Sequence, residues 1–197
     1  MTPRVGVLAL QGDVREHARV LTALGANVVL VRRPDELASV EGLVLPGGES
    51  SVIDKLARSF GMQAPIRAAI AGGLPVYGTC AGMILLADRI ENPITGQESF
   101  GGLDVTVRRN AFGGQVESFE TDLTVAGFDA PLHAAFIRAP LVTAAGSDAE
   151  VLATLPGDLG GGIVAVRQGP LLATAFHPEV SGETRFHELF LDLVRAA

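Results

Sequence analysis

The chain's only cysteine, Cys80, lies in the segment Gly78-Thr79-Cys80-Ala81-Gly82, between two apolar runs. The run before it predicts a buried strand, and the run from Ala81 onward predicts a helix. Small residues on both sides of Cys80 permit a sharp turn, which is the pattern of a nucleophile elbow with a thiol in place of the hydroxyl. Most lone cysteines are buried and inert, but this spacing instead predicts a thiol at the carboxyl edge of a parallel sheet, near the positive end of a helix.

The first half of the chain alternates apolar strands with helices. We expect strands at about residues 5–10, 28–31, 42–45 and 74–79, and helices at about 13–24, 34–40, 51–60, 64–71 and from 81. Strands that are apolar almost throughout, with helices between them, are typical of a parallel sheet covered on both faces.

The second half has a different pattern. Strands are expected at about residues 103–109, 116–121, 134–137, 141–144, 151–155, 163–167 and 171–176, joined by turns. They would extend the sheet in antiparallel fashion or form a small second sheet. A helix at about 183–195 should pack on the sheet, and 91–101 should be an exposed loop. The prediction is one α/β domain spanning residues 1–197, a three-layer flavodoxin-like sandwich whose central sheet is mostly parallel, with additional antiparallel strands in the C-terminal half.

Composition excludes several classes of function. The net charge is −7, and Lys/Arg clusters do not exceed adjacent pairs such as Arg32-Arg33, so nucleic-acid binding has little support. Apolar runs fall short of the roughly 18 residues needed to span a bilayer. The first residues lead directly into a strand without a signal-peptide pattern. A single cysteine cannot form an internal disulfide, which agrees with a reducing compartment. We therefore expect a cytoplasmic protein, and the short apolar runs predict no membrane association.

A second chemical signal lies in Phe176-His177-Pro178-Glu179, after an apolar strand. A cysteine nucleophile needs a base, and the base needs a group that orients it. An extended backbone points residues i and i+2 to the same side, and Pro178 favours an extended His177. His177 is therefore the predicted base and Glu179 the residue that orients it. The other three histidines, His17, His133 and His187, are expected to have surface roles.

Attack on an acyl carbon also requires donors for the developing oxyanion. The amide of Ala81 is one candidate. The second is Gly48 in Pro46-Gly47-Gly48-Glu49-Ser50, although this segment also fits an ordinary turn with Ser50 or Ser51 as the N-cap. Gln11 ends the first strand at the same edge of the sheet, where it offers an amide to a ligand or simply forms a turn.

Other enzyme classes fit less well. An α/β-hydrolase places its acid before the histidine in the sequence, whereas Glu179 follows His177. The chain has no Cys-x-x-Cys and its histidines are widely spaced, so no metal site is expected. The loop at Gly47-Gly48 lacks the Gly-Lys-Ser/Thr of a phosphate-binding loop, and no cofactor is expected.

These three motifs resemble the signatures of class I, triad-type glutamine amidotransferases. Further segments narrow the resemblance to the glutaminase subunits of pyridoxal 5′-phosphate synthase, essentially from end to end: Gln11-Gly12-Asp13-Val14-Arg15-Glu16-His17, Arg108-Arg109-Asn110-Ala111-Phe112-Gly113, Gln115-Val116-Glu117-Ser118-Phe119 and Phe136-Ile137-Arg138-Ala139-Pro140.

The resemblance implies that Cys80, His177 and Glu179 hydrolyse L-glutamine through a cysteinyl thioester. It implies that Gly48, Glu49, Ser50, Arg109, Ile137 and Arg138 contact glutamine, with Gly48 also in the oxyanion hole, and that Gln11 lies near the site and the partner interface. A guanidinium suits the substrate's α-carboxylate. The implied partner is a (β/α)8-barrel synthase subunit, in a complex of twelve copies of each chain, which receives the ammonia.

Three alternatives remain at this point. The chain could be the glutaminase of another pathway, such as histidine, anthranilate or GMP synthesis, which would use the same triad. It could be a catalytically silent binding protein of the same fold. It could also be an independent γ-glutamyl hydrolase or cysteine peptidase.

Overall fold

A computed structural model describes residues 2–112 and 118–197. Within this part of the chain, ten strands form a central sheet in which nine follow the order β2-β1-β3-β4-β12-β11-β9-β6-β5, and β10 pairs with β11. In that order, with β10 last, the strands are β2 (Asn27–Val31), β1 (Arg4–Leu8), β3 (Gly42–Leu45), β4 (Val76–Thr79), β12 (Leu171–Thr174), β11 (Ile163–Gln168), β9 (Leu141–Ala145), β6 (Leu103–Arg108), β5 (Ala87–Glu91) and β10 (Glu150–Thr154).

The parallel half of the sheet holds the most buried strands. The pairs from β2 through β1, β3 and β4 to β12 are all parallel, whereas β11 runs antiparallel to β12. Every residue of β3, β4 and β12 is buried, as expected for strands covered on both faces. Thr79 of β4 lies beside Thr174 of β12, so the segments that follow these two strands leave the sheet at the same edge.

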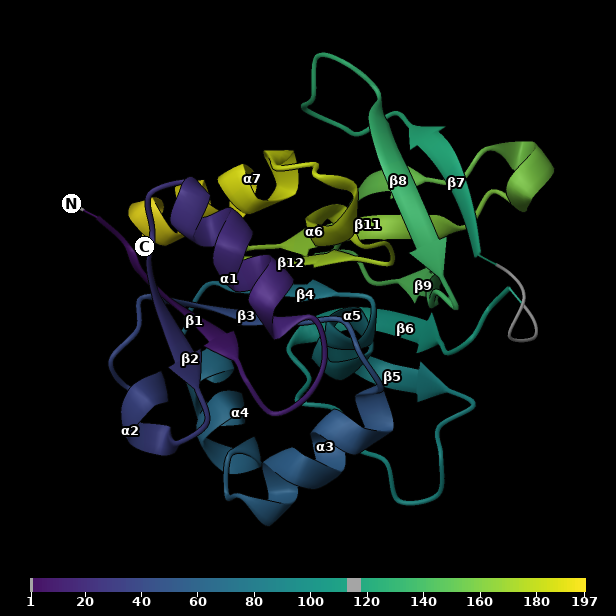
Figure 1. Cartoon of the computed structure of the whole chain (residues 1–197). Helices are drawn as coiled ribbons and strands as arrows, with labels where there is room; N and C mark the ends of the chain where they lie inside the picture. The colour runs from purple at the N-terminus through teal and green to yellow at the C-terminus, as the bar shows by residue number, and fades with distance from the viewer. Residues whose placement is uncertain (1, 113–117) are drawn as a thin grey trace.

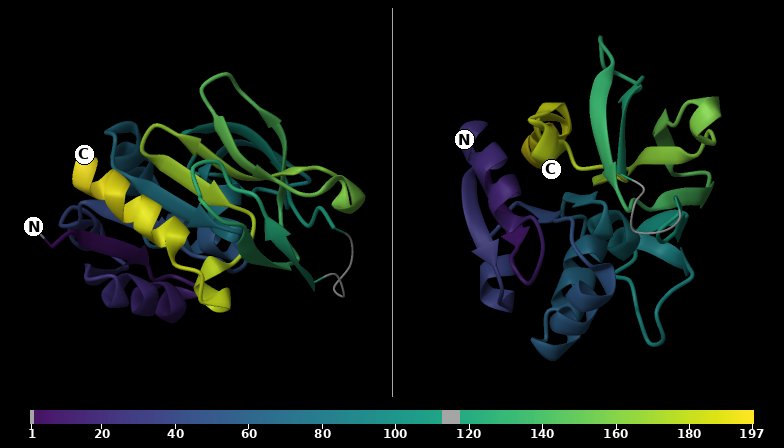
Figure 2. Two further views of the ribbon diagram at one scale, coloured as in Figure 1. Left: turned by 90° about the horizontal axis from the view of Figure 1, so that it is seen from above. Right: turned by 45° about the vertical axis from the view of Figure 1, so that its right-hand side comes forward.

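Helices cover both faces of the sheet, as Figures 1 and 2 show. On one face, α1 (Val14–Ala23) and α7 (Arg185–Ala196) are joined by a hydrogen bond between His17 and His187. The opposite face carries α3 (Ser50–Ser59), α4 (Gln63–Ala71) and α5 (Ala81–Leu86), with α2 (Pro34–Leu37) near β2 and α4. The three-layer α/β fold predicted from the sequence is therefore confirmed.

A two-stranded antiparallel sheet, β7 (Ser118–Leu123) with β8 (Leu132–Ile137), stands beside the main sheet (Figure 1). Its buried face packs Phe136 against Phe119, at a ring distance of 4.7 Å. The two possibilities left open for the second half both occur, because β9, β10 and β11 extend the main sheet while β7 and β8 form their own. Residues 116–117 of the strand expected at 116–121 lie outside the described residues.

Some expected elements differ from the structure. The helix after Cys80 ends at Leu86, because the chain continues directly into strand β5, which was not anticipated. The exposed loop expected at 91–101 is mostly exposed, but Glu91 belongs to β5 and Phe100 is buried. Two short helices were also missed, a 3-10 turn at Gly157–Leu159 and α6 at Pro178–Ser181.

Candidate active site

Cys80 occupies a strained turn between β4 and α5. Its φ of 48° and ψ of −101° lie outside the regions that non-glycine residues usually adopt, and such strain clusters at functional sites. The backbone N–H of Cys80 donates to the carbonyl of Thr174 at 2.8 Å, which fixes the turn to the neighbouring strand. The sequence prediction of an elbow with a thiol at its apex is thereby confirmed.

The two glycines of the motif are required by close packing. A methyl group at Gly82 would overlap the carbonyl oxygen of Leu45, and one at Gly78 would lie 2.5 Å from the carbonyl carbon of Gly82. The elbow therefore approaches the strand beside it more closely than any side chain would allow.

His177 follows β12 and reaches the same edge as Cys80. Its Nδ1–H donates to Oε1 of Glu179 at 2.8 Å, and both side chains are buried. Its backbone N–H donates to the carbonyl of Ala135 in β8 at 3.1 Å, so the second sheet helps to position it. The expected pairing of the two side chains is correct, but the expected reason was wrong. Pro178 begins the short helix α6, so Glu179 reaches His177 from a helical turn rather than along an extended strand.

Asp13 places a second carboxylate at the same nitrogen. Its Oδ2 lies 3.3 Å from Nδ1 of His177. Burial by itself lowers the pKa of His177, but hydrogen bonds to Asp13, Cys80 and Glu179 outweigh burial and raise the pKa to about 12. These partners therefore favour the protonated form of the imidazole. Burial raises the pKa of Glu179, an effect that His177 opposes.

Asp13, His177 and Glu179 are also close enough together to be considered as ligands for a cation. Nδ1 of His177 is the ring nitrogen that faces both carboxylates, and it is hydrogen-bonded to Oε1 of Glu179 at 2.8 Å. We therefore interpret the cluster as a histidine held by two carboxylates.

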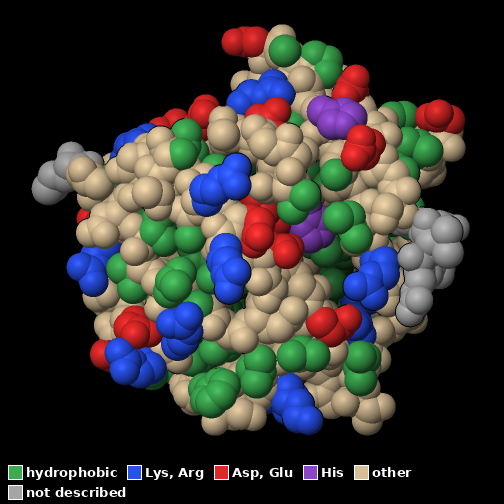
Figure 3. Space-filling view, in the orientation of Figure 1, with side chains coloured by type: hydrophobic (Ala, Val, Ile, Leu, Met, Phe, Trp, Pro, Cys, Tyr) green, Lys and Arg blue, Asp and Glu red, His purple; other side chains and the backbone are tan. Residues whose placement is uncertain are grey.

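A cavity of about 290 Å³ opens over Cys80 and His177. All the glutamine-contact residues expected from the sequence line it, together with four residues that were not assigned a role there. In the space-filling view, acidic and histidine side chains meet near the start of α1, in the middle of the face shown (Figure 3). The expected glutamine contacts are Gly48, Glu49, Ser50, Arg109, Ile137 and Arg138; Gln11 and Ala81, expected near the site and in the oxyanion hole, also line the cavity, and the additional residues are Asp13, Ile84, Asn110 and Val180.

Two opposite charges face each other in this cavity. Nη2 of Arg109 donates to Oε1 of Glu49 at 2.8 Å, and the Arg109 side chain is buried while that of Glu49 is half-exposed. Arg138, with a φ of 46°, is exposed at the rim. The cavity thus contains both a cation and an anion at its wall, as a zwitterionic ligand requires.

The loop at Gly47-Gly48 is held by its neighbours. The N–H of Glu49 donates to Oε1 of Gln11 at 2.8 Å, and the N–H of Asp13 donates to the carbonyl of Gly47 at 3.0 Å. Glu49, rather than Ser50 or Ser51, is the N-cap of α3, and its side chain accepts from the N–H of Ser51. The buried Ser50 accepts a hydrogen bond from Gln97, a contact from a distant loop that no local pattern indicated.

The two residues expected to supply backbone N–H groups to an oxyanion, Ala81 and Gly48, both line the cavity. Ala81 is the first residue of α5, so its N–H has no acceptor within the helix. Gly48 lines the cavity with a φ of 151°, in the region that favours glycine.

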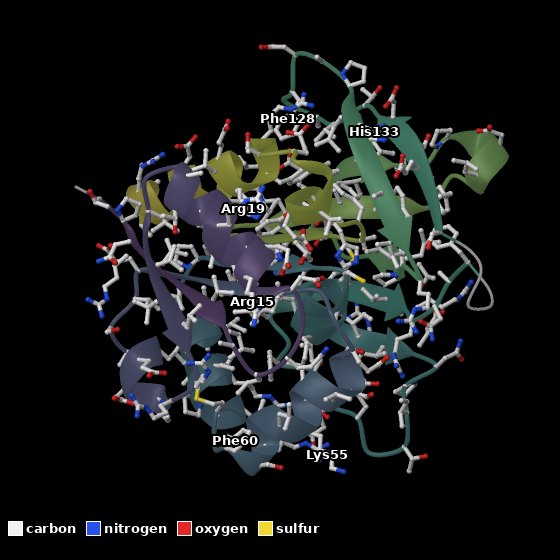
Figure 4. The ribbon with its side chains drawn as sticks, in the orientation of Figure 1. Arg15, Arg19, Lys55, Phe60, Phe128 and His133 are labelled. Atoms are coloured by element: carbon white, nitrogen blue, oxygen red, sulfur yellow. The ribbon has the colours of Figure 1, made fainter. Side chains whose placement is uncertain are left out.

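The expectation of surface roles was wrong for His17 and His187, which are both fully buried. His17 lies on the sheet-facing side of α1 and His187 on that of α7, and their rings hydrogen-bond at 2.9 Å. His133 is at the surface, as expected, on the exposed face of β8 (Figure 4), where it contacts Asp122 and Glu120. The apolar spacing around His187 could have indicated its burial.

The sequence comparison agrees with this geometry. A model of the SNO glutamine amidotransferase family matches residues 7–196. The pyridoxal 5′-phosphate synthase subunit PdxT of Leifsonia xyli subsp. xyli is 67% identical over 191 residues, which cover 96% of this chain and 95% of that protein. The subunit of the same name from Nocardioides sp. is 62% identical over 193 residues, covering 98% of this chain and 96% of that protein.

The structural comparison points the same way. The crystal structure of a glutamine amidotransferase superposes with a TM-score of 0.88 at 47% identity, covering 96% of this chain and 98% of that one. A strand-end cysteine beside a carboxylate-held histidine is the arrangement typical of the cysteine-triad class of enzymes. More specifically, the chain belongs to the SNO glutamine amidotransferase family, and it is a glutaminase.

Proposed function

We propose that this chain is the glutaminase subunit of a pyridoxal 5′-phosphate synthase, with Cys80 as its nucleophile and His177 and Glu179 as its base and orienting acid. The observation that carries the proposal is the position of Cys80 and His177 at one edge of the sheet, under a cavity lined by Glu49, Arg109 and Arg138. The whole chain, residues 1–197, acts as one glutaminase domain.

Binding precedes the chemistry. The guanidinium groups of Arg109 and Arg138 receive the α-carboxylate of L-glutamine, and Glu49 faces its α-ammonium group. Gly48, Ser50 and Ile137 complete the wall, and Gln11 holds the loop that carries Glu49. The side-chain amide of the substrate then points toward Cys80.

In the first chemical step, the sulfur of Cys80 attacks the side-chain carbonyl carbon, and the carbonyl oxygen takes the electron pair. The N–H groups of Gly48 and Ala81 donate to this oxyanion. His177 gives a proton to the amide nitrogen, the C–N bond breaks, and ammonia leaves a glutamyl thioester on Cys80. Water then attacks the thioester while His177 accepts its proton. The sulfur leaves with a proton from His177, and glutamate is released.

The ammonia is consumed by a separate subunit. Relatives at 62–67% identity carry the name of a pyridoxal 5′-phosphate synthase subunit, which supports a synthase as the partner of this chain. The resemblance described above suggests a barrel-shaped synthase in a complex of twelve copies of each chain. We place the reaction in the cytoplasm, because a single catalytic thiol is preserved in a reducing compartment. Among the described residues, no helix has the length and apolar character needed to cross a membrane.

From the sequence we expect a docking rim around the cavity mouth at Gln11–His17 and Gly47–Ser51, and we propose this surface here. Arg15 and Glu16 are exposed on α1 beside the mouth, and Arg19 follows one turn later (Figure 4). His17 lies in the same motif but is buried, so it takes no part in this surface.

The test is the rate of glutamate release from glutamine by this chain, alone and with a pyridoxal 5′-phosphate synthase barrel subunit. A weak rate that rises sharply with the partner is the expected result. A rate that responds only to the synthase of histidine, anthranilate or GMP formation would move the enzyme to that pathway. A high rate unaffected by any partner would indicate an independent hydrolase, and no rate in any mixture would indicate a silent binding protein.

A further inference from the structure

Behind the proposed triad lies a buried polar cluster that the reaction described above does not use. Nε2 of His17 lies 3.0 Å from Oγ1 of Thr79 and 3.5 Å from Oε1 of Glu179. Its Nδ1 lies 2.9 Å from Nε2 of His187. These groups come from α1, β4, α6 and α7, and His17, Thr79 and His187 have no exposed surface.

The contacts join both halves of the site. Thr79 immediately precedes Cys80, and Glu179 is the residue that holds His177. One imidazole therefore touches the strand end that carries the nucleophile and the carboxylate that orients the base. We propose that His17, held in place by His187, is a positioning residue that fixes Glu179 and the cysteine elbow relative to each other. This inference rests on the proposed triad.

The hydrogen-bond pattern selects one tautomer. If Nε2 of His17 carries the proton, it donates toward Glu179 and Thr79, while Nδ1 accepts from the Nε2–H of His187. The Nδ1 atom of His187, which has no partner among the described residues, is then an unused acceptor. The opposite tautomer would direct a lone pair of His17 at the Glu179 carboxylate and leave a buried N–H of His187 unpaired. An unpaired buried N–H is the rarer and costlier defect.

The surroundings keep both rings neutral. The titratable groups that face the pair are His177, Glu179 and Glu183, with Tyr77 packed edge-on against both rings. Burial lowers the pKa of His17, and His187 and His177 lower it further. Burial also lowers the pKa of His187, to about 4. A neutral pair places the N–H of His17 between Thr79 and Glu179 without adding a charge behind the triad.

The experiment compares three variants in the complex with the synthase subunit. His17→Leu removes the donor, and His17→Gln restores an N–H near the position of Nε2. Leu21→Ala is the matched control, since Leu21 is equally buried one turn later on α1. Glutamate release is measured as kcat and KM across the neutral pH range, with thermal unfolding as the measure of folding.

We expect His17→Leu to lower kcat by about ten- to hundredfold with little change in KM, as for other groups that orient a catalytic residue. His17→Gln should recover most of kcat, and Leu21→Ala should lower the melting temperature while keeping kcat. An unchanged kcat and pH profile in His17→Leu would overturn the inference, as would an equal loss in Leu21→Ala or no recovery in His17→Gln. Cys80→Ala distinguishes failure of the proposed triad from failure of the proposed role of His17. Glutamate release by Cys80→Ala would refute the triad itself. An inactive Cys80→Ala together with a fully active His17→Leu would refute only the role of His17.

Discussion

Glu179 holds His177 through a hydrogen bond of 2.8 Å between Oε1 and Nδ1, although only Pro178 separates the two residues in sequence. The bond directs the opposite nitrogen of the ring away from the carboxylate, and His177 and Cys80 both line the cavity. The two roles that we propose, orientation by Glu179 and proton transfer by His177, can therefore be tested separately.

Substitution of the two residues should separate these tasks by rate. His177→Asn removes the proton donor, so kcat for glutamate release should fall by about 10²- to 10⁴-fold. Glu179→Gln keeps the shape of the side chain but weakens its hold on the His177 imidazole. This variant should lose less activity than His177→Asn. His133→Asn, on the exposed face of β8, is the histidine control and should keep its rate. A larger loss in Glu179→Gln than in His177→Asn would contradict these roles.

Replacing Arg109 with lysine tests recognition of the substrate. A lysine keeps the charge but cannot form the fork that a carboxylate receives, so KM for glutamine should rise by about tenfold while kcat changes little. Initial rates over a range of glutamine concentrations measure both constants. Arg108→Lys is the control, because Arg108 forms a surface pair with Glu91 at 2.9 Å outside the cavity. Equal KM values for the two variants would argue against carboxylate binding by Arg109.

Gly47→Ala tests how tightly the loop packs against the base. A methyl group there would lie 2.5 Å from Cε1 of His177 and 2.6 Å from Oδ2 of Asp13, so the imidazole would have to move and kcat should fall. Gly157→Ala is the matched control, since nothing lies within 4 Å of its added methyl group. Both variants are assayed for glutamate release and for thermal unfolding. Full activity in Gly47→Ala would show that the position of His177 does not limit the rate.

The buried His17–His187 pair predicts a loss of stability in acid. Both folded-state pKa values lie below the ordinary value of 6.5, so below pH 6.5 the unfolded chain binds more protons than the folded one and stability falls with pH. His187, with a pKa of about 4, contributes a loss of about 3 kcal/mol by the time pH reaches about 4. Urea unfolding at several pH values measures the slope.

Substitution of His187 isolates its contribution to the pH dependence of unfolding. His187→Gln should flatten the pH dependence of unfolding between about pH 6.5 and pH 4. His133→Gln should not flatten it, because Asp122 and Glu120 raise the pKa of the exposed His133. Identical slopes in the wild type and His187→Gln would contradict burial of a neutral His187.

Local patterns predicted much of this structure because they report local chemistry. The spacing Gly78-Thr79-Cys80-Ala81-Gly82 specifies a turn that only small residues permit, and the structure has that turn. The apolar runs of β3, β4 and β12 predicted a sheet buried on both faces for the same reason.

What the sequence did not reveal depends on contacts between distant segments. His17 and His187 are 170 positions apart, so neither residue alone indicates that the other satisfies its ring nitrogen in the core. The contact of Asp13 with His177 similarly requires the start of α1 to lie beside the segment that follows β12, which is far away in the sequence. The extended path expected from His177 to Glu179 failed because a proline can also begin a helix.

The most direct test of the central claim is covalent labelling of this chain by a glutamine-analogue diazo ketone, in the complex with the synthase subunit. Intact mass and peptide mapping identify the modified residue. The account predicts one adduct on Cys80, protection by L-glutamine, and no adduct in Cys80→Ala. Labelling of another residue, or labelling of Cys80 that glutamine does not slow, would contradict Cys80 as the nucleophile of this glutaminase.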